Sequence, residues 1–430
     1  MTKRLMKDTN VGWVRDIPQH WDSIRGKYIF TNRKSVVGAK VDDYERLALT
    51  LNGVIRRSKD DNEGLQPTEF SGYQILKENE LVFKLIDLQN VSTSRVGLSK
   101  YTGIVSPAYV VLKTSKKVYP SFAEKYYLMM WMYEVFNALG DAGVRSNLNA
   151  KELLELRFPL PPYEEQIKIA DYLDSKCSEI DNLSKDIEHQ IETLEEYKKS
   201  VITEAVTKGL NPNVEMNDSD VPWIEKYPKE WQISEISFYT TSRSGGTPDR
   251  LNMDYWNGGT IPWMASGEVN KIFVTETNEK ITKLATRNSS AKIVPANSVM
   301  VALNGQGKTK GMSAILKIDA TCNQSLCAFK CDEVNLNYEY LFFCFQCMYK
   351  YLRGQAGDAI RDGLSASYVK KQRIPLPSFD EQLEISKFCM KKYIEIDSII
   401  TDKKKQLDTL TEYKKSLIYE YVTGKKEVIV

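Results

Sequence analysis

The stretch that decides the fold is Pro159–Thr207, which reads PLPPYEEQIKIADYLDSKCSEIDNLSKDIEHQIETLEEYKKSVITEAVT. It recurs at Pro375–Thr423 as PLPSFDEQLEISKFCMKKYIEIDSIITDKKKQLDTLTEYKKSLIYEYVT, without a gap and with roughly half of its positions identical. A shorter Trp-Pro-Trp pattern recurs upstream, at Val11–Trp21 and at Val221–Trp231. We therefore expect two similar halves, each a globular region followed by a long helix.

Each copy of the long repeat has the spacing of a coiled-coil helix. Apolar residues recur every seven positions, with a further apolar residue three or four positions after each, which is the a/d pattern of a helical seam. Each copy follows a proline-rich turn, begins with acidic residues and ends near a glycine, Gly209 or Gly424. The predicted seam includes Leu173, Ile180, Ile187, Leu194, Val201, Ile396, Leu407, Leu410 and Leu417. Further seam positions in the first copy are Cys177, Leu183, Ile191, Tyr197 and Ala205. Those in the second copy are Cys389, Tyr393, Ile400, Tyr413 and Tyr421, and Lys403 interrupts that copy.

The regions before the helices have a mixed pattern, so the predicted fold class is α+β. Short β-rich runs alternate with Gly, Asn and Ser turns, and each region closes with an apolar helical stretch, Phe122–Leu139 or Tyr338–Leu352. The expected domains are a first head, a central helix, a polar linker, a second head and a distal helix. Their boundaries are 1–158, 159–210, 211–220, 221–374 and 375–430.

Composition narrows the class of protein. The 430 residues include 59 basic and 57 acidic residues, which excludes a uniformly basic coat for nucleic acid. Residues 1–160 nevertheless hold 24 basic and 18 acidic residues, so the first head can attract phosphate. Seven cysteines without a secretory start indicate reduced thiols and a cytoplasmic protein, and no apolar run is long enough to span a membrane.

Three short motifs resemble catalytic or metal sites, but each lacks a required residue or lies in unsuitable surroundings. The adenine-methyltransferase loop needs Asn or Asp where Leu160 precedes Pro-Pro-Tyr. The phosphate-binding loop that would end at Gly307-Lys308-Thr309 needs glycine at Ala302. Cys344 and Cys347 have the spacing of zinc ligands but lie in an apolar run, so buried thiols are the favoured interpretation. The sequence therefore predicts no catalytic residue and no metal site.

The duplicated order of these motifs resembles the specificity subunit of type I restriction–modification systems, over essentially the whole chain. The residues that carry the resemblance are Pro159–Gln166, Pro375–Gln382 and the two Trp-Pro-Trp openings. The second head adds Ser244-Gly-Gly-Thr-Pro248, Ile261-Pro-Trp263 and Asn323-Gln324, whereas the first head lacks the Gly-Gly-Thr-Pro and Asn-Gln elements.

The resemblance implies a non-catalytic subunit with two target-recognition domains, each reading one half of a split site in double-stranded DNA. The two helices would pair as an antiparallel coiled coil with pseudo-twofold symmetry. They would bind two methyltransferase subunits, which carry S-adenosylmethionine and methylate adenine, and restriction subunits that use ATP would join them. No cofactor is expected in this chain.

Residues on polar loops are the candidates for DNA contact, because Arg and Lys bind phosphates and Arg, Asn and Gln can bind base edges. They are Arg56, Arg57, Lys84 and Arg95 in the first head, and Arg243, Lys271, Asn304, Gln306, Lys308 and Lys310 in the second. The alternative function, which the near-zero net charge favours, is a coiled-coil adaptor with two protein-binding heads and no role in DNA binding.

Overall fold

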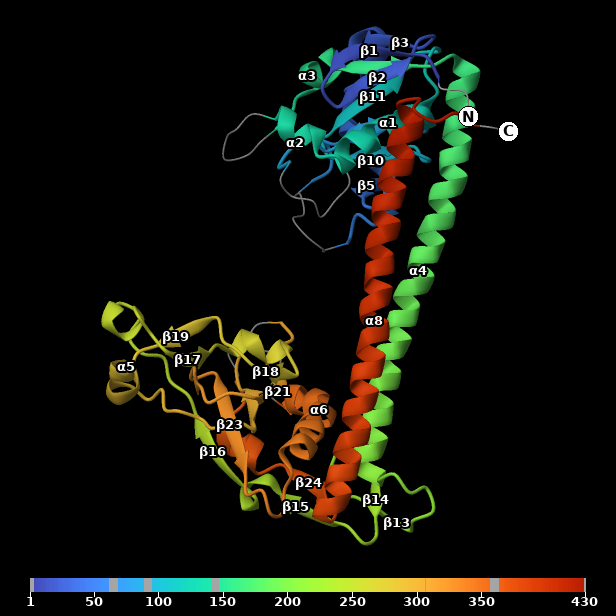
Figure 1. The fold of residues 1–430 in the computed structure, drawn as a ribbon. Helices are drawn as coiled ribbons and strands as arrows, with labels where there is room; N and C mark the ends of the chain where they lie inside the picture. Colours follow the sequence, from blue (N-terminus) through green and yellow to red (C-terminus); the bar gives the residue numbers. More distant parts are fainter. Residues whose placement is uncertain are drawn as a thin grey trace. The chain divides into compact units, whose positions relative to one another are not determined.

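The computed structural model describes residues 4–61, 69–88, 95–140, 147–305, 307–355 and 363–428. The chain forms two compact units, Met1–Glu188 with Lys404–Val430, and His189–Lys403. Each unit contains one globular head, the first part of the helix that follows this head, and the last part of the other long helix (Figure 1). Each head is therefore folded together with segments of both long helices.

The first head is built on a four-stranded antiparallel sheet in the order β4-β11-β8-β9. A second four-stranded sheet has the order β6-β5-β10-β7, in which β5 and β10 run parallel. Two-stranded sheets join β1 to β2 and β3 to β12. The strands are β1 (Met6–Val11), β2 (Val14–Pro18), β3 (Asp22–Arg25), β4 (Phe30–Asn32), β5 (Arg46–Thr50), β6 (Gly53–Arg57), β7 (Gln74–Leu76), β8 (Leu81–Phe83), β9 (Val96–Leu98), β10 (Gly103–Val105), β11 (Val110–Thr114) and β12 (Arg157–Leu160).

The second head repeats this plan, but its main sheet gains a fifth strand and its smaller sheet has three strands instead of four. Its main sheet has the order β16-β23-β20-β21-β18, a smaller sheet has the order β19-β17-β22 with β17 parallel to β22, and β13-β14 and β15-β24 form two-stranded sheets. The strands are β13 (Met216–Asp218), β14 (Lys226–Pro228), β15 (Gln232–Glu235), β16 (Thr240–Ser244), β17 (Ile261–Met264), β18 (Phe273–Val274), β19 (Glu279–Ile281), β20 (Ser298–Ala302), β21 (Ser313–Leu316), β22 (Thr321–Cys322), β23 (Leu326–Cys331) and β24 (Arg373–Leu376). The duplication thus extends through heads whose sequences differ.

Eight α-helices accompany these strands in the described residues. They are α1 (Pro120–Met132), α2 (Val135–Leu139), α3 (Ala150–Glu155), α4 (Tyr163–Lys208), α5 (Lys283–Asn288), α6 (Tyr338–Gln355), α7 (Ala366–Lys370) and α8 (Phe379–Val422). Short 3-10 helices cover η1 (Gly26–Tyr28), η2 (Gly38–Asp43), η3 (Ile236–Phe238), η4 (Met253–Tyr255) and η5 (Ser266–Asn270). The apolar stretch expected as one helix over Phe122–Leu139 is divided between α1 and α2, because Glu134 has a φ of 56° and interrupts the helical path.

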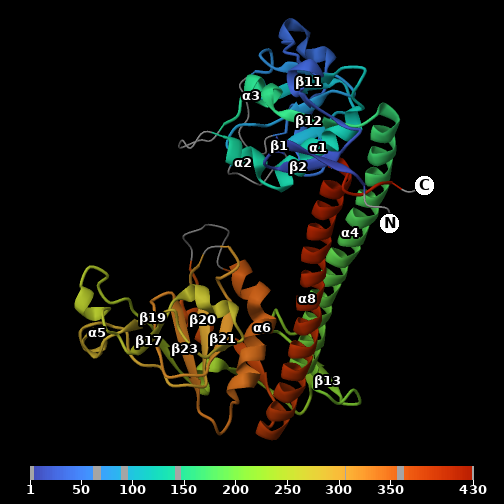
Figure 2. The same ribbon diagram turned by 45° about the horizontal axis from the view of Figure 1, so that its top comes forward.

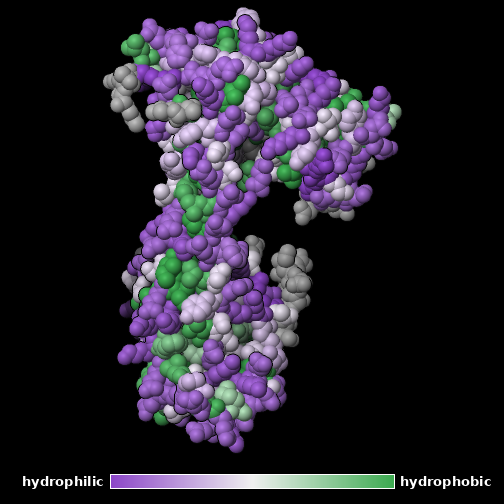
Figure 3. Space-filling view, turned by 90° about the vertical axis from the view of Figure 1, so that its right-hand side faces the viewer, coloured by the Kyte–Doolittle hydropathy of each residue, from purple (hydrophilic) through white to green (hydrophobic). Residues whose placement is uncertain are grey.

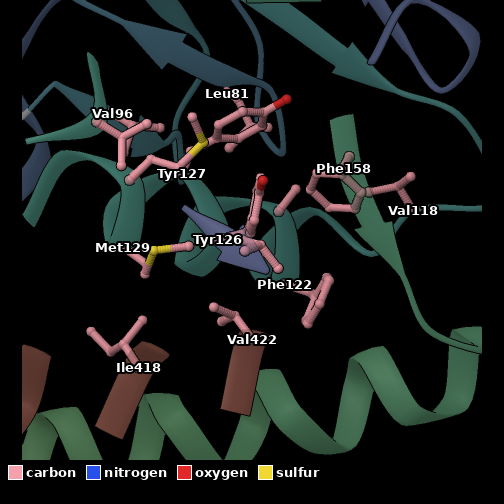
Figure 4. Packing of buried hydrophobic residues seen from close by; sticks show 14 of the residues in the cluster. Leu81, Val96, Val118, Phe122, Tyr126, Tyr127, Met129, Phe158, Ile418 and Val422 are labelled. Carbon is pink, nitrogen blue, oxygen red and sulfur yellow. The ribbon is translucent and has the colours of Figure 1, made fainter. Parts of the chain in front are cut away.

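In unit 1, the end of α8 is part of the core of the head. Figure 4 shows Ile418 and Val422 from α8 facing α1, with Ile418 near Met129 and Val422 near Tyr126, and Phe158 of β12 lies in the same buried cluster. Each of these side chains is less than a tenth exposed, and burying one contributes about 1.5–3 kcal/mol. The folding of the head and the docking of the helix end are therefore coupled.

Unit 2 has the equivalent arrangement with the other helix. Ile202 and Val206 near the end of α4 belong to one buried cluster with Tyr340 of α6 and Cys389 of α8. Helix α6 packs against β20 and β21 of the main sheet (Figure 2). The Tyr340 hydroxyl donates a hydrogen bond to the Val206 carbonyl at the end of α4, which ties the helix end to the head.

The long helices α4 and α8 pair, as the repeat predicts. Of the predicted seam residues, Leu173, Ile180, Ile187, Ile396 and Leu417 are buried, whereas Leu194, Val201, Leu407 and Leu410 are half-buried. In unit 1 Lys414 of α8 binds Asp181 of α4 at 2.6 Å, and in unit 2 Lys198 of α4 binds Asp397 of α8 at 3.1 Å. In the repeat, Asp397 and Lys414 are the counterparts of Asp181 and Lys198, so one ion pair repeats the other.

Three predicted seam positions are wrong. Leu183, Tyr197 and Tyr413 are 48%, 52% and 53% exposed. The seam keeps a strict seven-residue repeat and falls on the next positions, the half-buried Ser184, Lys198 and Lys414. The seam accepts Lys198 because Asp397 neutralises it. It accepts Lys403, the expected interruption, because the Gln190 side-chain oxygen accepts a hydrogen bond from its amine at 2.6 Å.

No helix in the described ranges is both long enough and apolar enough to cross a membrane. The long helices carry mainly polar side chains outside their seam. Figure 3 shows this polar surface, interrupted by patches of hydrophobic residues.

Candidate nucleic-acid interface

The loops of the second head meet at one edge of its main sheet. Strand β23 is antiparallel to both β16 and β20, so the ends of β16 and β20 lie beside the start of β23. Backbone hydrogen bonds join the loops there, since Leu303 N and Asn304 N both donate to the Ser325 carbonyl. Three segments that are distant in sequence are thereby brought to one surface, which we call the loop edge: 245–248, the described part of 303–312 (303–305 and 307–312), and 323–325.

The loop edge includes most of the predicted contacts of the second head. Asn304 and Lys308 are exposed on the loop after β20, and Lys310 is half-buried. Lys271 is exposed and comes two residues before β18. Because β18 is parallel to β21, and the start of β21 pairs with the end of β20, Lys271 lies at the same edge of the sheet. Gln306 lies outside the described residues. The edge therefore presents amines and an amide together, as contacts to phosphates and bases require.

Helix α6 holds the loop after β20 in place. One Arg353 guanidinium nitrogen donates to the carbonyls of Gly307 at 2.9 Å and Lys310 at 3.2 Å, and the Tyr349 hydroxyl donates to the Lys308 carbonyl at 2.6 Å. Gly307 and Gly311 have φ of 58° and 85°, values that favour glycine. The loop is built as a constrained turn, so the position of Lys308 is set by the fold.

Arg243 lies beside this edge on β16. Its side chain is exposed and donates a long hydrogen bond, 3.4 Å, to the Ile293 carbonyl. Together with Lys330 it lines a shallow hollow of about 210 Å³. A cationic group at the rim of an open hollow is suited to a phosphate oxygen.

The first head presents Arg56 and Arg57 on β6. Arg56 is exposed, 3.0 Å from Glu45, and its guanidinium lies 4.5 Å from the centre of the Tyr101 ring. Arg57 is half-buried and binds Asp61 at 2.6 Å. These interactions orient both guanidinium groups, and exposed Arg56 is the better placed of the two for a ligand.

Lys84 and Arg95 adjoin each other at the end of β8, where the Lys84 amide donates to the Arg95 carbonyl. Lys84 is half-buried, but Arg95 is completely buried and donates to the carbonyls of Ile86 and Asp87. Burial lowers the pKa of the Arg95 guanidinium, and Asp87 partly opposes this effect. The expectation that Arg95 contacts DNA is therefore wrong in this structure, because the side chain supports a loop from the inside.

The Glu-Gln pair of the Pro-Leu-Pro motif joins each helix to its head, a role that the sequence analysis missed. The Gln166 side chain is buried, donates to the carbonyls of Lys117 and Pro161, and accepts from the Tyr119 amide. Gln382 makes the equivalent three hydrogen bonds in unit 2, with Asn335, Pro377 and Asn337. The exact recurrence of Gln at the same repeat position was the available indication of this role.

The cysteines are uniformly buried, and burial raises the pKa of Cys322 to about 12 and that of Cys327 to about 11. Such thiols are poor nucleophiles because little thiolate forms near neutral pH. Among the residues that the structure describes, no group of three or more His, Cys, Asp or Glu side chains could hold a metal ion.

Comparison with known proteins identifies the family of a chain with two heads that are each followed by a long helix. The family model described as "Type I restriction modification DNA specificity domain" matches residues 24–193 and 228–409, one match per half. The chain therefore belongs to the family of type I restriction–modification DNA specificity subunits.

Individual relatives agree with the family match. The chain is 23% identical to the type I restriction enzyme MjaVIII specificity subunit of Methanocaldococcus jannaschii, over 82% of this chain and 80% of that protein. It is 26% identical to the EcoR124I/EcoR124II specificity subunit of Escherichia coli, over 42% and 46%.

The fold also matches solved structures. A chain from a study of complex assembly and conformational transition of the type I R-M system aligns with a TM-score of 0.72 at 12% identity, covering 95% of this chain and 99% of that one. The HsdS subunit from Thermoanaerobacter tengcongensis aligns with a TM-score of 0.50 at 12% identity, covering 95% and 98%.

Proposed function

We propose that this specificity subunit directs a type I restriction–modification complex to a split sequence in double-stranded DNA, with one half read by each head. The observation that carries the proposal is the duplication of the head. The order β4-β11-β8-β9 in the first head corresponds to β16-β23-β20-β21 in the second, and β6-β5-β10 corresponds to β19-β17-β22. The heads differ in their loops, and loops on a shared scaffold are where binding specificity varies.

The loop edge supports DNA as the ligand of the second head. Asn304, Lys271 and Lys308 combine a group that can bind base edges with cations for the backbone. Arg243 adds a cation beside the edge, and Arg56 supplies an exposed guanidinium in the first head. Because the family is one of specificity subunits, we assign no catalytic step to this chain.

The partners in this proposal are two methyltransferase subunits and, in the restricting form, restriction subunits. The methyltransferase subunits would bring S-adenosylmethionine and methylate adenine, while the restriction subunits would use ATP. Since the target is DNA, we place the complex in the cytoplasm.

Exposed apolar residues on the long helices support docking of two identical partners. Leu183 and Tyr413 are 48% and 53% exposed in unit 1, and their repeat counterparts, Ile399 and Tyr197, are 46% and 52% exposed in unit 2. A single exposed apolar residue needs no explanation, but the same pair exposed in both units provides two equivalent surfaces. We therefore place one methyltransferase subunit on each pair.

The proposal is tested by a methylation map. The chain is co-expressed with its cognate methyltransferase subunit in a host without DNA methylation, and modified bases are located by sequencing. We expect one split motif, methylated on opposite strands in its two halves. If the complex forms and the methyltransferase is competent, but no new methylation is found, the proposal fails and the protein-binding adaptor becomes the better function.

The docking surfaces are tested separately by the mass of the complex. Tyr413→Asp and Tyr197→Asp should each remove one of two methyltransferase subunits, and the double variant should remove both. Native mass spectrometry gives the stoichiometry, and thermal unfolding shows that the variant chains are folded. Two bound subunits in the double variant would exclude these surfaces.

A further inference from the structure

Two segments of the loop edge are joined to each other by hydrogen bonds. None of their residues is among the predicted DNA contacts. Gly245-Gly246-Thr247-Pro248 follows β16, and Asn323-Gln324-Ser325 precedes its neighbour β23 (Figure 1). The Gly246 amide donates to the Cys322 carbonyl at 2.8 Å, and the Gly246 carbonyl accepts from the Trp263 indole at 3.0 Å. The backbone amide of Asn323 donates a hydrogen bond to the Met264 carbonyl, which fixes the second segment.

Close packing makes both glycines necessary at this turn. A Cβ atom on Gly245 would lie 2.2 Å from the Cys322 carbonyl oxygen, and one on Gly246 would lie 1.9 Å from the Ser290 hydroxyl oxygen. Neither space can accept a side chain without movement of the chain. The two segments are therefore held in direct backbone contact.

This framework presents one pair of exposed polar side chains. The Thr247 hydroxyl donates a hydrogen bond to the side-chain oxygen of Gln324, and both residues are exposed, although Pro248 beside them is buried. The hydrogen bond restrains the amide of Gln324. Its nitrogen keeps its N–H donors, and its oxygen keeps a second lone pair.

An amide held in this way matches one base edge in the major groove. Adenine presents a donor, N6–H, next to an acceptor, N7, and Gln binds both at once. Guanine presents two acceptors at the same positions, so it leaves the Gln oxygen without a donor. The cations Lys271 and Lys308 of the same edge are suited to hold the flanking phosphates.

We propose that Gln324 reads an adenine in the half-site of the second head and that Thr247 is the positioning residue that orients its amide. The inference rests on the proposed function and names the base contact within it. It concerns a recognised adenine, distinct from the adenine that the methyltransferase modifies.

The test uses the complete chain in its methyltransferase complex and the same methylation map. Gln324→Ala should relax one adenine position in one half of the motif, with a loss of discrimination of about 10-fold to 100-fold, and leave the other half unchanged. Gln324→Glu should shift the preference at that position toward cytosine, because a carboxylate can only accept a hydrogen bond. Gln232→Ala is the matched control, since Gln232 is an exposed amide of the same head on β15, away from the loop edge.

The role of Thr247 has its own readout. Thr247→Val should relax the same position without changing thermal unfolding or complex assembly, and Thr247→Ser should restore the discrimination because it keeps the hydroxyl. A merely structural role would instead lower stability and leave the motif intact.

The outcomes separate this inference from the proposed function. An unchanged motif in Gln324→Ala overturns the inference and leaves the function standing. A uniform loss of methylation over all sequences, with the complex intact, also overturns it, because this result would indicate a phosphate contact. If the unmodified chain itself directs no split motif, the proposed function fails first.

Discussion

At the residue scale, each Pro-Leu-Pro motif is followed by a glutamate that binds a tryptophan, and the charged groups around the two glutamates differ. Trp21 and Trp231 each donate an indole hydrogen bond, to Glu165 and Glu381 respectively, both at 3.0 Å. Burial raises the pKa of both carboxyl groups. Around Glu165, hydrogen bonds from Arg4, His20 and Trp21 outweigh burial and lower the pKa, whereas around Glu381 burial prevails and the pKa is raised.

These opposite shifts predict opposite effects of neutralisation. Glu165 contributes stability above its ordinary pKa and loses it as pH falls through the lowered folded value, whereas ionised Glu381 opposes folding once pH rises through its raised value. At pH 7, Glu165→Gln should reduce the free energy of unfolding by about 1–2 kcal/mol, and Glu381→Gln should not reduce it. Thermal unfolding at pH 7 and pH 4 checks both variants, and equal destabilisation by the two at pH 7 would contradict the assignment.

Arg95 gives a second prediction at this scale. Because its guanidinium is buried against the carbonyls of Ile86 and Asp87, Arg95→Ala should destabilise the first head by about 3 kcal/mol through lost packing and unpaired carbonyls. DNA affinity, measured at a temperature where the variant is folded, should stay within about twofold. A large loss of affinity without a loss of stability would restore Arg95 as a DNA contact.

At the element scale, the long helices show how a seam tolerates charge. The strict seven-residue repeat puts Lys198 and Lys414 in the seam, and each is neutralised by an Asp of the other helix. Leu183, Tyr197 and Tyr413 stand next to seam positions and are exposed, although hydrophobicity alone predicts that they are buried. Spacing prevails because every seam residue must face the partner helix along the whole pair.

The seam can be tested with two substitutions on one helix. Ile396 is 4% exposed and Ile394 is 53% exposed. Ile396→Asp should destabilise the paired helices by about 3 kcal/mol or more, because it buries an unpaired charge, whereas Ile394→Asp should be tolerated within about 0.5 kcal/mol. Urea unfolding followed by circular dichroism measures both, and similar midpoints for the two variants would contradict the seam.

At the scale of the whole molecule, the two heads are separate recognition modules in the function that we propose. Arg56→Ala in the first head and Lys308→Ala in the second should each remove one phosphate contact. The slope of the logarithm of the binding constant against the logarithm of the salt concentration should then become shallower by about one. Because the sites lie in different units, the losses in binding free energy should add within about 0.5 kcal/mol in the double variant. Fluorescence anisotropy of labelled DNA at several salt concentrations measures both effects, and strong non-additivity would contradict independent modules.

The duplication, the long helices, their pairing and the family can all be predicted from the amino-acid sequence. These features are repetitive, and a period of seven or a recurring motif can be read without knowledge of distant contacts. The sequence also indicates which residue types could contact DNA, and Lys308 and Asn304 are exposed on the loop edge as a contact requires.

The positions of the side chains depend on contacts between distant parts of the chain. Arg95 has the chemistry of a DNA contact, but it is buried and donates to the carbonyls of Ile86 and Asp87. Thr247 and Gln324 are 77 positions apart, and only the pairing of β16 with β23 brings them together. Pairing between distant strands leaves no periodic pattern in the sequence. A helix does leave one, because the residues on its buried face recur every three or four positions.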